Sequence, residues 1–426
     1  MGDCETARAW QNTHCRYDIL PRLPDMEPRM SLVEPPITSE RVSYAALARL
    51  FLRLSLLAFG GPVAHVAMMD DELVVRRQWL SRPHFLDLLA ATNLIPGPNS
   101  TEVAIHVGYT LRGISGAFVT GFCFIFPSFV LTLILAVLYV ASGAIPQVES
   151  LLWGIKPAII AIIAVAAYRL APAALGNRAL AVLFVAGLVA AGPLDIPEVV
   201  VMVGSGVLYA AYRALRDRVA SSGGLLMVGL LALLSPAAQA AQAAATSVTA
   251  GDLFWYFLRI GAVLFGTGYV LIAYIQQDLV VTFGWLTAQQ LLDAVAIGQL
   301  TPGPVSTTAA VVGYIVAGFP GAVAAIVGMF LPSFLLVILT APLIPKMRGS
   351  RFMGDFLSGV NAGVVAAILI TVLMLADEAF RTADGALSPL ALLLFALALV
   401  GLIRIRLNAT WLILAGALVG LLSGQM

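Results

Sequence analysis

Two short stretches of the chain combine a helix break with hydroxyl side chains. LIPGPNSTEV begins at Leu94 and LTPGPVSTTA at Leu300, each within apolar sequence. Because proline lacks an N–H group and clashes with the preceding turn, a helix must end near the first proline, and a new one can begin at the second. The first N–H groups of the new helix have no carbonyl partner, and its start carries about half a positive charge. Bare amides, a positive helix end and hydroxyls together favour anion binding.

The apolar sequence around these motifs places the chain among membrane proteins. Of its 426 residues, 60% are hydrophobic and only 11% are charged, whereas a water-exposed surface needs more charge. Apolar runs near the ~20 residues that span a bilayer recur, for example FCFIFPSFVLTLILAVLYVA from Phe122. We therefore predict an all-α polytopic membrane protein.

Composition excludes several other classes of protein. The formal net charge is +1, so nothing indicates nucleic acid binding. The three cysteines, Cys4, Cys15 and Cys123, match neither a disulfide framework nor a zinc spacing. The sequence has no nucleophile–base set, nucleotide-binding loop or metal cluster, so we expect neither an enzyme nor a bound cofactor.

The chain contains the same pattern twice. FLRLSLLAFGGP from Phe51 matches FLRIGAVLFGTG from Phe257, and the same offset of 206 residues pairs the two Pro-Gly-Pro motifs. After a one-residue deletion, Pro127-Ser128-Phe129 matches Pro332-Ser333-Phe334. We predict a disordered tail over 1–40, a first repeat over 41–222, a linker with one crossing segment over 223–249, and a second repeat over 250–426. Internal repeats with interrupted apolar segments are typical of secondary transporters.

Basic residues, which prefer the cytoplasmic side of membrane proteins, indicate that the two halves have opposite orientations. Between its two breaks the first half has Arg76, Arg77 and Arg82, whereas the matching QQDLVVTFGWLTA of the second half has no Lys or Arg. After the helix that contains Pro-Ser-Phe, the bias reverses. SGAIPQVE of the first half has no Lys or Arg, whereas IPKMRGSR of the second half has three. We therefore predict inverted repeats, about nine full crossings, broken segments that return to the side they came from, and a cytoplasmic N-terminus.

The candidate anion-binding residues are the motif glycines, the polar residues that follow them, and two arginines that precede FGGP and FGTG. An arginine within a membrane is costly and is a functional candidate by default, although each could instead snorkel or pair with Asp87 or Asp293. The set comprises Gly97, Asn99, Ser100, Thr101, Gly303, Ser306, Thr307, Thr308, Arg53 and Arg259.

Five further residues are candidates for ion coupling or charge balance. Asp87 and Asp293 precede their motifs at the same distance, and paired acids inside membranes either relay protons or balance arginines. Glu102 has capping-box spacing, which favours a structural role. Lys156 could face the site or snorkel, and His65, present in one half only, could pack, hydrogen-bond or carry a proton.

The breaks themselves are predicted hinges, because glycine and proline concentrate there. The hinge residues are Gly60, Gly61, Pro62, Pro96, Pro98, Gly266, Gly268, Pro302 and Pro304. Glu72 and Asp278 also match between the halves but lie toward segment ends, so we expect them to be exposed interface charges.

The motifs resemble those of the chromate ion transporter family. The stretches FGGPVAHVAMMDDELVVRRQWLS, FLDLLAATNLIPGPNSTEVAIHVGY and GISGAFVTGFCFIFPSF carry the resemblance, which extends over about 45–425. The second copy departs from it at FGTGYV and lacks a histidine equivalent to His65. Degenerate second copies are typical of the family's long-chain, two-domain members.

The resemblance implies chromate efflux across the inner membrane, powered by an ion gradient and giving chromate resistance. Sulfate, a tetrahedral dianion of similar size, stays open as substrate. The alternatives are an importer or exchanger of sulfate-like anions and a gated anion channel. We expect as partners the oxyanion, the lipid bilayer and a proton or counter-anion, with a homodimer as one option.

Overall fold

The computed structural model describes residues 42–423 except 60, 143–145, 195, 218–247, 266–267, 344–349, 382–385 and 406. Within this part of the chain the secondary structure is helical, apart from one bridge pair between Arg381 and Leu387. The predicted tail, the hinge residues Gly60 and Gly266 and the predicted crossing at 224–241 lie outside the described residues.

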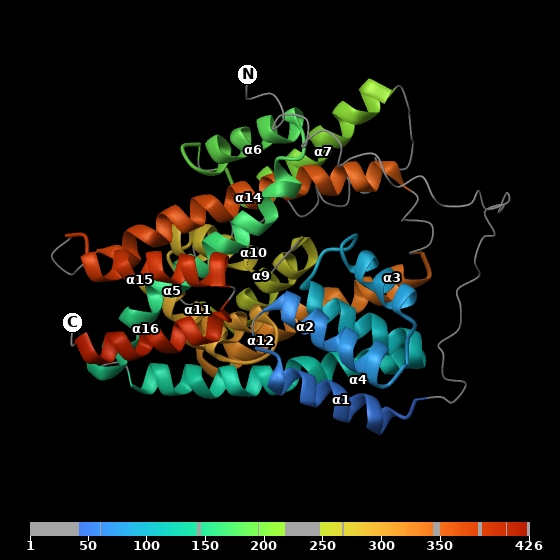
Figure 1. Ribbon diagram of the computed structural model, residues 1–426, viewed down its shortest axis with the longest axis horizontal. Helices are drawn as coiled ribbons and strands as arrows, with labels where there is room; N and C mark the ends of the chain where they lie inside the picture. The colour runs from blue at the N-terminus through green and yellow to red at the C-terminus, as the bar shows by residue number, and fades with distance from the viewer. Residues whose placement is uncertain are drawn as a thin grey trace, which may run out of the picture. The chain divides into compact units, whose positions relative to one another are not determined.

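The first half is a series of helices interrupted at the two predicted breaks (Figure 1). Ser43 caps the first helix, and Pro62 begins the helix after FGGP. The elements are α1 (Tyr44–Leu57), α2 (Pro62–Asp70), the π-helix η1 (Asp71–Arg76), α3 (Arg82–Thr92), α4 (Asn99–Ala141), α5 (Pro146–Ala174), α6 (Arg178–Ala191) and α7 (Glu198–Asp217).

The second half repeats this order, including a π-helix at the equivalent position. Its elements are α9 (Ala250–Val263), α10 (Val270–Ile275), the π-helix η3 (Gln276–Thr282), α11 (Ala288–Leu300), η4 (Val305–Thr307), α12 (Thr308–Thr340), η5 (Ala341–Leu343), α14 (Arg351–Phe380), α15 (Pro389–Val400), η6 (Gly401–Ile405) and α16 (Ala409–Ser423). The duplication read from the sequence is therefore a structural duplication.

The helices that follow the Pro-Gly-Pro motifs each fold back on themselves at a glycine. Gly113 in α4 has φ 67°, and Gly318 in α12 has φ 63°. Beyond the turn, Thr120 Oγ1 donates to the carbonyl oxygen of Ala104 at 2.8 Å, which joins the two arms of α4 side by side. Each Pro-Gly-Pro motif is therefore followed by a short helical arm. At the glycine the chain reverses direction, and a longer helical arm packs beside the short one.

The packing between the halves is reciprocal. α5 packs against α15 and α16 of the other half, and its equivalent α14 packs against α6 and α7 (Figure 1). α4 contacts its own equivalent α12, as α5 contacts α14. Reciprocal contacts between equivalent elements are those of an approximate two-fold axis. A two-fold axis in the membrane plane would invert one half relative to the other.

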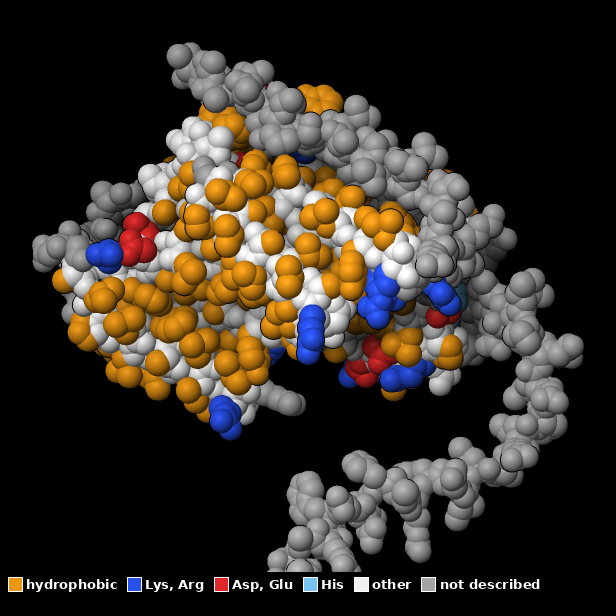
Figure 2. Space-filling view, turned by 90° about the horizontal axis from the view of Figure 1, so that it is seen from above, with side chains coloured by type: hydrophobic (Ala, Val, Ile, Leu, Met, Phe, Trp, Pro, Cys, Tyr) orange, Lys and Arg blue, Asp and Glu red, His pale blue; other side chains and the backbone are white. Residues whose placement is uncertain are grey.

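The surface matches a lipid environment. Among the described residues, five segments are long and apolar enough to cross a membrane: α4, α5, α7, η4 with α12, and α14. Shorter apolar helices include α6, α15 with η6, and α16. Figure 2 shows hydrophobic side chains over most of the described surface on one face, and Leu215 and Trp411 are among the exposed ones. The number of full crossings stays a prediction.

The inverted orientation can be tested at two equivalent positions. Val75 in η1 and Val281 in η3 are 55% and 46% exposed. In a chain without its native cysteines, we expect V75C to react with a membrane-impermeant maleimide only in inside-out vesicles, and V281C only in right-side-out vesicles. Labelling of both from the same side would contradict inverted repeats.

Candidate anion-binding site

Each Pro-Gly-Pro turn is completed by the opposite half of the protein. The N–H of Gly97 donates to the carbonyl oxygen of Leu264 at 2.6 Å, and the N–H of Gly303 donates to that of Ala58 at 2.9 Å. Ala58 and Leu264 are equivalent residues that immediately precede the glycine-rich breaks. All four interruptions are therefore joined in two reciprocal pairs.

These two positions require glycine. Gly97 has φ 149° and Gly303 has φ 101°, backbone conformations that other residues rarely adopt. A methyl group on Gly97 would collide with Glu102 and Ser333, and one on Gly303 would collide with Ser128. Ser128 and Ser333 are the serines of the repeated Pro-Ser-Phe motif. We did not predict them as site residues, although their recurrence was visible.

Both helices that follow the turns begin without a side-chain cap. The N–H of Thr101 donates to the Pro98 carbonyl at 2.9 Å, so our expectation that this amide lacks a carbonyl partner was wrong. Among the described backbone contacts, the amides of Asn99 and Ser100 have none. The second half has the same arrangement. The N–H of Thr307 donates to the Pro304 carbonyl oxygen, and among the described backbone contacts the amides of Val305 and Ser306 have no acceptor.

The capping box predicted for Asn99 and Glu102 does not form. The Asn99 side chain instead donates to Oδ1 of Asn93 at 2.9 Å. Glu102 is fully buried, and neither of its carboxyl oxygens has a hydrogen-bond partner in the described structure. Its role is therefore not that of a cap.

A buried histidine links the first helix start to the first glycine-rich break. His65 Nε2 lies 3.1 Å from the carbonyl oxygen of Ala58, and Nδ1 lies 3.2 Å from the Ser100 hydroxyl. Because a carbonyl only accepts, Nε2 carries a proton, and in the neutral ring Nδ1 accepts from Ser100. His65 thereby holds in place both Ser100 and Ala58, whose carbonyl oxygen also accepts from the Gly303 amide.

The hydroxyls of the second half form a chain across the two halves. Thr307 Oγ1 lies 3.2 Å from Ser128 Oγ and donates to the Pro304 carbonyl at 2.8 Å. Thr132 Oγ1 donates to Thr301 Oγ1 at 3.1 Å. Thr308 Oγ1 donates to the carbonyl oxygen of Val305, which lies at the start of the same helical segment. Thr307 and Thr308 are therefore satisfied within the protein.

Several buried polar groups at the turns have no such partner. In the part of the chain that the structure describes, the hydroxyls of Ser55, Thr101, Ser306 and Ser333 are buried without a hydrogen bond. Ser306 Oγ lies close to Gly268, at the second glycine-rich break. Buried polar groups normally have a partner, so these hydroxyls are suited to contact a ligand or water.

The two candidate arginines pair with carboxylates. Arg53 lies 3.9 Å from Glu72, and Arg259 lies 3.8 Å from Asp278. Of the alternatives considered, pairing with Asp87 or Asp293 is not observed. The expected exposure of Glu72 and Asp278 was wrong, because they are only 8% and 5% exposed.

Glu72 contacts two further arginines besides Arg53, so its single negative charge is shared among three guanidinium groups. Arg76 and Arg77 also pair with Glu72, at 3.3 and 3.1 Å. Arg259 in addition lies over the ring of Tyr256. A buried carboxylate needs a compensating cation, which explains why each arginine contacts its acid.

Two of the charge candidates, Lys156 and Asp293, meet in a second buried cluster. Lys156 Nζ of α5 lies 3.7 Å from Oδ1 of Asp293 in α11, and the Tyr139 hydroxyl of α4 donates to Oδ2 at 2.9 Å. Lys156 therefore faces the interior rather than snorkelling. Asp87, the equivalent of Asp293, is exposed, so the halves differ here.

The remaining predicted hinges lie in the turns. Gly61 has φ 79°, and Pro62 is the first residue of α2. α3 ends at Thr92, before Pro96, and Pro98 immediately precedes α4. In the second half, Pro302 lies in the turn and Pro304 immediately precedes η4. The positions of the breaks agree with the proline positions in the sequence.

Comparison with known families agrees with this architecture. The family model "Chromate transporter" matches residues 45–210 and 251–421, once in each half. The chain belongs to the chromate transporter family. This family consists of transporters rather than enzymes.

Curated relatives extend over most of the chain. The chromate transport protein of Cupriavidus metallidurans is 34% identical over 388 residues, covering 91% of this chain and 94% of the relative. That of Pseudomonas aeruginosa is 32% identical over 400 residues, covering 91% and 93%. The probable chromate transport protein of Synechococcus elongatus is 32% identical over 348 residues, covering 80% and 86%. No solved structure matches the chain.

The turn glycines give one prediction. We expect G97A and G303A to lower the thermal stability of the detergent-purified protein, because each adds a strain of about 1–3 kcal/mol in addition to a steric collision. G204A is the matched control, since a methyl group there meets no atom within 4 Å and favours the α7 helix. Equal melting temperatures for G97A, G303A and G204A would contradict the turn geometry.

The buried ion pair gives another prediction. We expect D293N and K156M each to destabilise the protein by about 3–5 kcal/mol, because each removes one member of a buried ion pair. The double variant should lose less than the sum of the two, which thermal unfolding of all four proteins would measure. Strict additivity would show that Lys156 and Asp293 do not interact.

Proposed function

We propose that the chain is a secondary active transporter that exports a tetrahedral oxyanion, chromate, across the inner membrane and so gives chromate resistance. The observation that carries this proposal is the reciprocal closure of the two Pro-Gly-Pro turns. It joins two uncapped helix starts, each with free amides, to the breaks of the opposite half. Two positive helix ends in one buried region suit a dianion better than a cation or a neutral solute.

The binding groups we propose are the amides at both helix starts and the unpartnered hydroxyls beside them. Ser306, Thr101 and Ser333 can donate to oxyanion oxygens without breaking a contact in the protein. Ser100 can donate if it releases His65. Gly97 and Gly303 permit the close approach of these groups. Arg53 and Arg259 act indirectly in this proposal, since their carboxylate pairs hold the broken segments.

Energy for export would come from a proton or counter-anion gradient, acting through buried titratable groups. Glu102 lies beside Gly97, so its negative charge would oppose a bound dianion, whereas its neutral form would not. Asp293, Lys156 and Tyr139 form a second cluster for charge balance. We further propose that the N-terminus is cytoplasmic and the two repeats are inverted, as the arginine bias indicates.

Chromate uptake into inside-out vesicles tests this function. The wild-type chain should accumulate chromate when a gradient is imposed, and S306A should raise KM about tenfold, because a hydrogen bond to a charged group contributes about 1.5–3 kcal/mol. S358A is the matched control, since Ser358 is a half-buried serine on α14 whose hydroxyl donates to the Gly354 carbonyl oxygen. We expect E102Q to transport without responding to an imposed pH gradient.

The other outcomes separate the alternatives. Uptake that needs no gradient and merely equilibrates chromate would indicate a channel. Strong competition by sulfate, with preferred movement in the opposite direction, would indicate a sulfate-type importer or exchanger. An absence of chromate flux in all vesicles would refute the proposed function, and a normal KM in S306A would refute the proposed site.

A further inference from the structure

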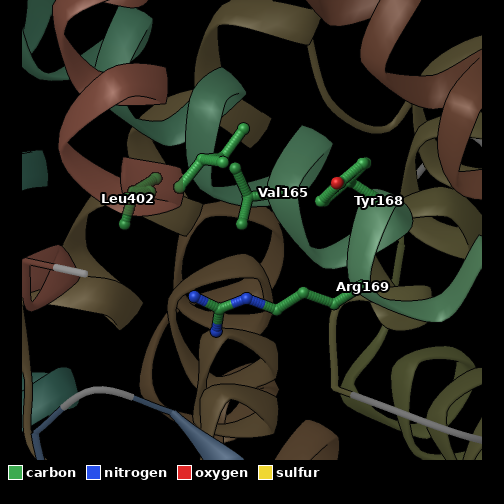
Figure 3. Close-up of a pocket in the computed structure, with 5 residues that line it drawn as sticks. Val165, Tyr168, Arg169 and Leu402 are labelled. Carbon is green, nitrogen blue, oxygen red and sulfur yellow. The ribbon is translucent and has the colours of Figure 1, made fainter. Parts of the chain in front are cut away.

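A pocket of about 380 Å³ lies where α5 meets η6, outside the turns described above. Its lining combines apolar side chains with the polar groups of Tyr168 and Arg169, and Figure 3 shows the Arg169 side chain extending from α5 beneath Val165 and Leu402. The lining residues are Val165, Tyr168, Arg169, Leu402 and Ile403. Arg169 and Arg178 at this end of α5 indicate that it lies on the cytoplasmic side, because basic residues prefer that side.

Arg169 differs from the arginines of the broken segments in its ion pairing. Arg53 and Arg259 each pair with a buried carboxylate. Among the described residues, no carboxylate forms an ion pair with Arg169. A guanidinium beside an open cavity, with its donors unpaired, is a binding group for an anion.

Tyr269 follows the second glycine-rich break directly and lies near the first one. Arg169 and Gln299 are both in the neighbourhood of its hydroxyl. That hydroxyl would be 3.3 Å from a Cβ placed on Gly61. Gln299 precedes the second Pro-Gly-Pro motif, and its Nε2 is buried without a partner in the described structure. Polar groups therefore lead from Arg169 toward breaks in both halves.

We infer that Arg169 is the first binding residue for the oxyanion on its way to the Pro-Gly-Pro turns. The planar guanidinium donates two parallel hydrogen bonds to a tetrahedral oxyanion at the pocket. Tyr269 and Gln299 then donate to the anion as it moves toward the helix starts. This inference rests on the proposed function and adds a recognition step outside the turns.

The test measures chromate uptake into inside-out vesicles at several ionic strengths. R169Q should raise KM at least tenfold, which corresponds to about 1.4 kcal/mol. Its kcat/KM should also become less sensitive to salt, because the charge that attracts the dianion is gone. R169K keeps the charge but not the paired donors, so it should keep the salt dependence and show an intermediate KM.

R178Q is the matched control, because Arg178 is an exposed arginine at the start of the next helix and lines a different pocket. It should keep the wild-type KM. A wild-type KM in R169Q, or an equal rise in R178Q, would overturn the inference while leaving wild-type chromate uptake intact. If R169Q fails to reach the membrane, R169K decides alone: a wild-type KM in R169K refutes the requirement for a paired donor. Absence of uptake by the wild type would instead refute the proposed function.

Discussion

Backbone amides that lie inside apolar surroundings must find an acceptor, and this constraint determines how the two halves fit. An unsatisfied amide in hydrocarbon costs several kcal/mol. Gly97 and Gly303 interrupt their helices, and each amide is received by a carbonyl of the opposite half, from Leu264 and Ala58. The same exchange continues in the packing of α5 on α16 and of α14 on α7. Neither broken region is complete without the other half.

In the site we propose, recognition of the anion at the turns falls to backbone and hydroxyl groups, because the nearby charged side chains are already paired. The buried carboxylates Glu72 and Asp278 engage the nearby arginines, and Asp293 engages Lys156. Fixed dipoles lose no side-chain entropy on binding and are oriented before the ligand arrives. A site of this kind binds an anion without holding it as tightly as a cluster of free arginines would, which suits release after transport.

The fold was predictable from sequence where local chemistry determines it. The constant offset between the repeats gave the duplication, and the proline positions gave the breaks at Pro96 and Pro302. Contacts between distant residues were not predictable in this way. The Lys156–Asp293 pair depends on how α5 and α11 pack, and equal spacing of Asp87 and Asp293 concealed that only one of them is buried. Glu102 had the spacing of a cap, but Asn99 bonds Asn93 instead.

The reciprocal turns also bear on how such a protein can evolve. A polypeptide with a single repeat would lack the carbonyl that its own Pro-Gly-Pro turn requires, so it would have to associate with a second copy. Joining two repeats in one gene fixes their ratio at one to one and removes the need for each to fit an identical neighbour. The copies are then free to specialise: His65 fixes Ser100 in one, whereas Leu271 stands at the equivalent position in the other and leaves Ser306 unbound.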